Sequence, residues 1–124
     1  MSRITLRKLA FAAAWCPLLA PTAGCHSYHI DTTIENRSGS AVQLLEVDYP
    51  SASFGVDAIA ADADFHYRFD VLGSGPITIQ YTGANRQAVK KTGPTLYERQ
   101  EGRMQIMLLP GGQVEFHSEL TPHS

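Results

Sequence analysis

Cysteine is scarce in this sequence of 124 residues, where only Cys16 and Cys25 are present. Its most apolar run, residues 9–20, is twelve residues long, well short of the ~20 that a membrane-spanning helix needs. No stretch shows a helical hydrophobic period over ten or more residues, and no Gly-x-Ser-x-Gly motif is present. These absences exclude a disulfide-stabilised scaffold, a transmembrane protein of the helical type and a helical bundle.

Positive charge is also sparse beyond the first residues. Residues 25–124 keep seven of the ten basic residues and all twelve acidic ones, a formal charge of −5. The basic pair Lys90-Lys91 stands alone there and suits a solvated strand edge. Because nucleic-acid binding depends on clustered Lys and Arg, we expect no nucleic-acid partner.

The first 24 residues have the three zones of an export signal. Residues 1–8 carry three positive charges and no acidic residue, residues 9–20 are apolar, and residues 21–24 are mostly small. A short apolar core between these flanks is typical of a cleaved signal peptide. We therefore predict that residues 1–24 are removed.

The segment Thr22-Ala23-Gly24-Cys25 resembles the lipobox of bacterial lipoproteins. The resemblance implies cleavage between Gly24 and Cys25, a diacylglycerol on the Cys25 thiol and acylation of the new amino group by a fatty acid such as palmitate. Thr22 departs from the family, which usually has an aliphatic residue there. His26 stands where Asp would retain the protein in the inner membrane of some bacteria, which favours the outer membrane.

The count of cysteines agrees with this interpretation. Cys16 lies in the segment that is removed, so Cys25 is left without a partner for an intramolecular disulfide. Lipidation explains a lone cysteine in an exported protein. The alternative is an ordinary secreted protein with a free thiol.

Beyond the anchor, apolar and polar residues alternate with the period of a β-strand. Residues 28–35 form the first such run, and residues 41–49 the second, with a change of parity that predicts a bulge near Leu44-Leu45. Residues 65–71 and 77–81 predict a hairpin, and residues 104–108 and 114–116 predict another around Gly111-Gly112. Weaker strands are expected at residues 54–59, 87–92 and 95–98.

Short strands separated by turn signals predict an all-β fold, an antiparallel sandwich of seven to eight strands. The pattern looks like small immunoglobulin-like or transthyretin-like envelope domains. The expected organisation is a signal peptide (1–24), a lipidated anchor and short tether (25–27), the sandwich (28–120) and a loose tail (121–124).

Candidate sites are few. His66 and His117 both fall on the outward parity of their strands and are weak candidates for metal ligands. The segment from Tyr49 to Phe54 places two aromatic residues around small polar ones, as in an adaptable contact loop, although both rings could instead belong to the core. We expect no resident cofactor and no enzymatic activity, since no catalytic constellation is present.

The sequence thus favours an envelope lipoprotein that acts as a non-enzymatic interaction or structural module. Its expected partners are membrane lipid, through acylated Cys25, and another envelope protein. The alternative is a periplasmic metal- or small-ligand-binding protein.

Overall fold

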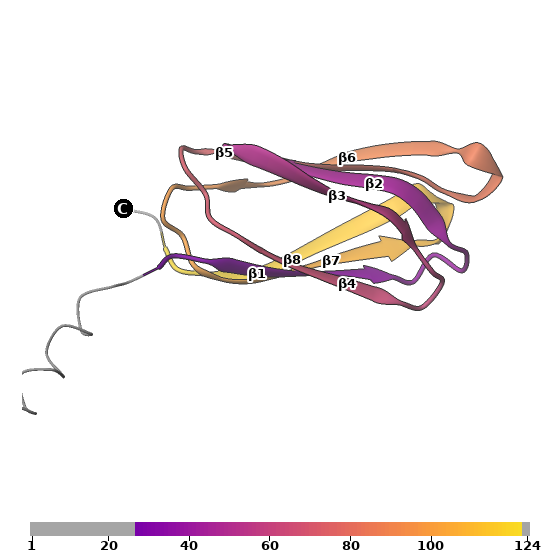
Figure 1. Cartoon of the computed structure of the whole chain (residues 1–124), viewed down its shortest axis with the longest axis horizontal. Coiled ribbons are helices and arrows are strands. Elements are labelled where there is room, and N and C mark those ends of the chain that lie inside the picture. The colour runs from indigo at the N-terminus through magenta and orange to yellow at the C-terminus, as the bar shows by residue number, and fades with distance from the viewer. Residues whose placement is uncertain (1–26, 123–124) are drawn as a thin grey trace, which may run out of the picture.

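The computed structural model describes residues 27–122, which form a two-layered β-sandwich (Figure 1). Alternating burial along the strands turns one face of each sheet toward a shared core, as the period of the sequence predicts. The strands are β1 (Ile30–Asn36), β2 (Val42–Tyr49), β3 (Ala52–Ile59), β4 (Asp64–Phe69), β5 (Gly75–Thr82), β6 (Ala88–Leu96), β7 (Gly102–Leu109) and β8 (Gln113–Leu120).

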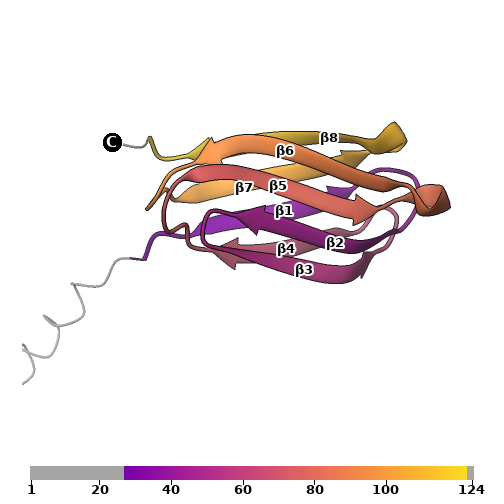
Figure 2. The same cartoon turned by 90° about the horizontal axis from the view of Figure 1, so that it is seen from above.

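Each layer has four strands. One sheet has the order β4-β1-β7-β8 and the other β3-β2-β5-β6. Figure 2 looks onto the second sheet, with β3 and β4 along one side of the sandwich and β6 and β8 along the other. All pairings are antiparallel except that of β1 with β7, which is parallel, with Ile30 opposite Gly102. The predicted sandwich is confirmed.

The core lies between the sheets and is mainly aliphatic. Its buried side chains come from every strand except β8, whose Val114, Phe116 and Leu120 pack against it while partly exposed. The least exposed include Ile30, Ile34, Val42, Leu45, Val47, Ile77, Ile79, Leu96, Met104, Ile106 and Leu108. Since no described cysteine crosslinks the sheets, this packing holds the sandwich together.

The bulge predicted near Leu44-Leu45 is confirmed. Leu44 has a φ of 51°, and the register between β2 and β5 shifts between Gln43 and Glu46. The extra residue lets both Val42 and Leu45 face the core, while Leu44 is left 70% exposed. In a regular strand Val42 and Leu45 would point to opposite faces of the sheet, and only one of them could be buried.

One of the two predicted hairpins is wrong. β7 and β8 pair as expected, although the connection is a short 3-10 turn, Pro110–Gly112, with both glycines at a φ of 76°. β4 and β5, in contrast, belong to different sheets. Between them Val71 is buried, so the connection crosses the end of the core instead of turning back within one sheet.

Three boundaries also differ from the prediction. The weak strands expected at 87–92 and 95–98 are a single strand, β6, and β3 begins at Ala52, inside the expected loop. The tail is not loose at its start, because the Thr121 N–H donates to the Glu101 carbonyl at 2.9 Å. The Gln100 side chain in turn donates to the Thr121 carbonyl at 2.8 Å.

Across residues 27–122 there is no helix of the length and apolarity that crossing a membrane requires.

Candidate functional site

Polar side chains form three rows across the outer face of the sheet β4-β1-β7-β8. The strand register aligns them, because residues that lie opposite each other point to the same side of the sheet. We call these twelve side chains, eleven polar ones and the methionine Met107, the polar face. The rows are Arg68-Asp31-Arg103-Glu119, His66-Thr33-Gln105-His117 and Asp64-Glu35-Met107-Glu115.

In the first row, charges of opposite sign alternate. Arg68 Nε donates to Asp31 Oδ1 at 2.7 Å, and Arg103 pairs with Glu119 at 3.1 Å. The hydrogen bond from Arg68 to Asp31 raises the pKa of that guanidinium. All four side chains are mostly exposed, so these pairs add little to stability and instead fix where each charge lies.

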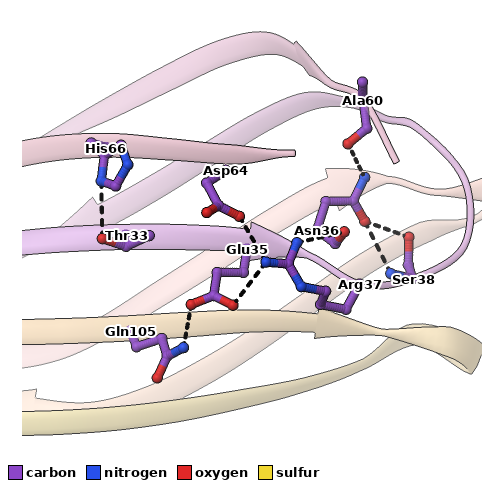
Figure 3. Close-up of polar contacts among 9 residues, drawn as sticks. All are labelled: Thr33, Glu35, Asn36, Arg37, Ser38, Ala60, Asp64, His66 and Gln105. Atoms are coloured by element: carbon purple, nitrogen blue, oxygen red, sulfur yellow. Dashed lines mark hydrogen bonds and ion pairs between the residues drawn. The ribbon is translucent and has the colours of Figure 1, made fainter. Parts of the chain in front are cut away.

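Arg37 joins the third row to the end of β1. Its Nη2 lies 3.2 Å from Glu35 Oε1 and 3.1 Å from Asp64 Oδ1, so one guanidinium bridges two carboxylates. Glu35 also accepts a hydrogen bond from Gln105. Figure 3 shows the Arg37 side chain between both carboxylates. Each carboxylate of the polar face therefore has a partner within the protein, because Glu115 is also paired, with His117 at 3.3 Å.

The two histidines proposed as metal ligands lie in the same row but at opposite edges of the sheet. β1 and β7 separate them, and three strand spacings amount to about 14 Å. Two imidazoles that share a zinc ion each bind it at about 2 Å, so this pair cannot share one. His66 Nδ1 lies 3.0 Å from Thr33 Oγ1 instead. Among residues 27–122 no three His, Cys, Asp or Glu side chains are grouped as metal ligands would be.

Tyr49 of β2 and Phe54 of β3 lie in an aromatic cluster with side chains of β4. Phe54 is 7% exposed and stacks on Tyr67, with ring centroids 4.1 Å apart. Tyr49 stacks on Phe69, also at 4.1 Å, and burial is the main cause that raises the pKa of its hydroxyl. The Phe54 ring thus belongs to the core, and Tyr49 is only partly accessible.

Asn36 is fully buried at the end of β1 and satisfies five polar groups. Its Nδ2 donates to the carbonyls of Ser40, Ile59 and Ala60 at 2.9, 3.0 and 3.1 Å. Its Oδ1 accepts from the N–H and the hydroxyl of Ser38 at 3.1 and 2.6 Å. Figure 3 shows the side chain reaching the β3–β4 connection at Ala60. Asn36 therefore clamps two connections together.

Cys25 and Gly24, the predicted lipidation and cleavage positions, lie outside the described residues. The described chain reaches the sandwich at His29, whose Nδ1 lies 2.6 Å from Asp70 Oδ1. Gly102 N–H also donates to the His29 carbonyl at 3.1 Å. The entry to β1 is thus fixed to the β4–β5 connection and to the first residue of β7.

A groove of about 650 Å³ runs over the polar face, and its walls include Asp31, Glu35, Arg103 and Glu119. General acid–base catalysis needs a titratable group held within hydrogen-bond reach of a bound substrate. Here the carboxylates are engaged with neighbouring side chains on an open surface. This arrangement is suited to contact with another molecule.

The buried hydroxyl of Tyr81 is a feature of the structure that the sequence alone does not predict. The side chain is 5% exposed, and its hydroxyl has no hydrogen-bond partner among the described residues. A signal was available: Tyr81 follows Ile77 and Ile79 on the inward parity of β5, where a hydroxyl needs a partner.

The chain matches no protein-family model and no curated protein. Among solved structures it is similar to an NMR structure of a protein from Eubacterium rectale. The TM-score is 0.55 at 12% sequence identity, over 76% of this chain and 93% of that one. At this identity the similarity concerns the fold alone. The class that fold and surface define is a small β-sandwich protein.

Proposed function

We propose that this protein is a lipid-anchored envelope protein whose β-sandwich is a non-enzymatic interaction or structural module. The anchor is the diacylglyceryl group expected on Cys25, and the outer membrane is the favoured location. The proposal includes the expected kinship with immunoglobulin-like or transthyretin-like envelope domains. The two-sheet architecture supports that kinship at the level of fold class.

The observation that carries the interaction role is the pairing of charges on the polar face. Asp31, Glu35 and Asp64 are each held by an arginine. Side chains that are already ordered lose little entropy when a partner binds, and fixed charges select a partner by complementarity. The polar face therefore suits recognition of a protein surface with a matching pattern of charge.

The short distance between anchor and domain supports a membrane location for this module. Ile30, the first residue of β1, follows Cys25 by only a few residues. A lipid at Cys25 would hold the adjacent end of the sandwich close to the headgroups. Partners in the same membrane would then be the ones within reach.

The anchor is tested by replacing the cysteine. In cells that express the full chain, labelled palmitate should enter the wild-type protein and not Cys25→Ser. The variant should also leave the membrane fraction or accumulate as precursor. Wild-type protein that takes up no label, or a variant that stays membrane-bound at mature size, would show that the anchor is wrong.

The interaction role is tested separately with a photo-crosslinking residue in the polar face. Gln105 in β7 is the test position, and Thr78 in β5, which is also half-buried, is the matched control on the opposite sheet. We expect a discrete crosslinked product in intact envelopes from position 105 and none from position 78. The same products from both positions, or none from either, would contradict a partner at the polar face.

A further inference from the structure

β4 forms one edge of its sheet, and its outer side is open. Among residues 27–122 it pairs with β1 and with no other strand. Figure 2 shows β4 along one side of the sandwich, next to β3 of the other layer. Tyr67 has the inward parity of the buried Phe69 and is still 40% exposed at this edge. An open edge presents N–H and C=O groups to which a further strand can bind.

The backbone groups on the open side of β4 belong to Asp64, His66 and Arg68. The Asn36 N–H donates to the Ala63 carbonyl at 3.0 Å, at the end of the pairing between β1 and β4. Such hydrogen-bonded pairs recur at every second residue of an antiparallel ladder, so the odd-numbered residues of β4 direct their backbone groups toward β1. The even-numbered residues therefore direct theirs to the open side.

These three residues also place their side chains on the polar face at regular spacing. An acid and a base, Asp64 and Arg68, lie two residues to either side of His66. A second copy of β4 that pairs antiparallel, with the two His66 residues opposite each other, brings each Asp64 opposite an Arg68. In the same register Phe65 lies opposite the second copy's Tyr67 on the other face. The edge is thus complementary to itself in both charge and aromatic character.

The contacts that these charges make within one copy leave them able to bind a second one. Arg68 reaches Asp31 through Nε at 2.7 Å, and a guanidinium has further donors on its two Nη atoms. Asp64 accepts from Arg37 at Oδ1, and its second oxygen can accept as well. The existing contacts hold both charges in place, which lowers the entropy lost when the copies meet.

The other edge strands do not have this symmetry. β8 has the same spacing around His117, but Glu115 and Glu119 lie on the two sides, so pairing centred there would oppose carboxylates. β3 carries a single charge, at Asp57. β6 is interrupted by Pro94, which has no N–H to donate. Self-pairing is therefore specific to β4.

We propose that two copies of this protein pair through β4, antiparallel and with His66 on the two-fold axis. The two sheets of order β4-β1-β7-β8 then join edge to edge, and the polar face continues from one copy to the other. The inference goes beyond the proposed function, because it needs neither the lipid at Cys25 nor another protein at the polar face. The open edge and its self-complementary charges carry it.

The symmetry has a consequence for copies that are anchored as proposed. A two-fold axis perpendicular to the sheet places the two chain entries at opposite ends of the pair. Two lipid anchors in one membrane would therefore lay the strands parallel to the bilayer surface. Confinement to the membrane raises the concentration of each copy around the other, which favours pairing through a short edge.

The test places a cysteine on the two-fold axis. Opposite residues of a hydrogen-bonded antiparallel pair have Cα atoms about 5.5 Å apart, a separation that a disulfide spans. His66→Cys in the full chain, expressed in cells and treated with a mild oxidant, should give a covalent dimer on a non-reducing gel. His117→Cys is the matched control, since it is also exposed on an edge strand, and should give at least fivefold less. Wild-type protein controls for links through Cys25.

An exchange of charges tests the register. Asp64→Arg and Arg68→Asp, each combined with His66→Cys, oppose like charges across the axis and should reduce the covalent dimer about fivefold or more. When the two variants are expressed together, each position 64 again faces an opposite charge at position 68. A mixed dimer should then form at the level of His66→Cys alone, which also shows that both variants are folded.

Three results would overturn the proposal. Equal dimer from His66→Cys and His117→Cys would show random collision, and a link from position 66 to another protein would assign the edge to a different partner. Single charge variants that dimerise undiminished would contradict the register. Should a single variant fail to fold, the double exchange in one chain keeps the net charge, and its covalent dimer should match that of His66→Cys alone.

Failure of this inference and failure of the proposed function remain distinguishable. Labelling and fractionation of Cys25→Ser report on the anchor, and crosslinking at position 105 reports on the polar face. Neither readout depends on position 66.

Discussion

Replacing Asn36 by alanine should destabilise the sandwich strongly, and the structure allows the size of the effect to be worked out. Among the groups that the side chain satisfies, its bond to the Ile59 carbonyl is fully buried, while the other four are partly buried. An orphaned buried carbonyl costs about 1–3 kcal/mol, and each bond whose groups can be rehydrated costs about 0.5–1.5 kcal/mol. Because water can replace part of these bonds, we expect a net loss of about 3–5 kcal/mol.

This loss is large compared with the ~5–15 kcal/mol by which a domain is usually stable. The measurement is urea unfolding followed by far-UV circular dichroism. Arg37→Ala is the matched control, because it removes the neighbouring, half-exposed ion pairs to Glu35 and Asp64. Its expected cost is below about 1 kcal/mol.

Asn36→Asp sharpens the test, because it keeps the shape of the side chain and removes its donor. A carboxylate at this position would face the carbonyl oxygens of Ser40, Ile59 and Ala60. Burial and repulsion would raise its pKa in the folded state above the unfolded value of about 3.9. Relative to wild type, the variant should then be most stable below about pH 4 and lose stability as the pH rises. The clamp would be refuted if Asn36→Ala unfolded at the same urea concentration as Arg37→Ala, or if Asn36→Asp showed no such pH dependence.

Three further predictions concern groups that are buried or packed against the core. Thr32 is 2% exposed and its hydroxyl has no described partner, so Thr32→Val should stabilise the protein by about 1 kcal/mol, seen as a higher urea midpoint. An unchanged or lower midpoint would show that the hydroxyl is satisfied. Gly93→Ala should cost about 1–3 kcal/mol in the same assay, because its Cβ would lie 2.7 Å from the Phe116 ring, and a neutral effect would contradict that close approach. Burial raises the pKa of Tyr49 and Tyr81, so these hydroxyls contribute stability that is complete below pH 10 and lost as the pH rises further. Replacing either tyrosine by phenylalanine should remove one late step from a titration followed by absorbance at alkaline pH. An unchanged titration would contradict the raised pKa of that hydroxyl.

The sequence predicts the strands well where side-chain parity determines them. Two adjacent leucines, Leu44 and Leu45, cannot both face the core of a regular strand, and this conflict alone predicts the bulge. Which strands pair with each other is harder to predict from the sequence. The short connection at residues 70–74 is compatible with a hairpin between β4 and β5. In the structure Val71 of this connection is buried in the core, and the chain crosses there to the other sheet.

The candidate site could be predicted only in part. Outward parity correctly places His66 and His117 on a solvent-facing surface, but it cannot say which strands lie between them. Their separation follows from the insertion of β7 next to β1, a parallel pairing between distant segments. The contacts of Asn36 depend on carbonyls from two connections that are brought together only by the complete fold.

That parallel pairing also dictates the order in which the fold can be completed. β1 comes first in the sequence, yet it is a central strand whose two neighbours are β4 and the much later β7. A chain that becomes available from its amino terminus leaves one side of β1 unpaired until residues 102–109 arrive. Contacts so distant in sequence make folding slow, because a long loop must close before they form. If Cys25 is lipidated as proposed, the modifying enzymes can therefore act on a chain whose first strand still lacks one of its two neighbours.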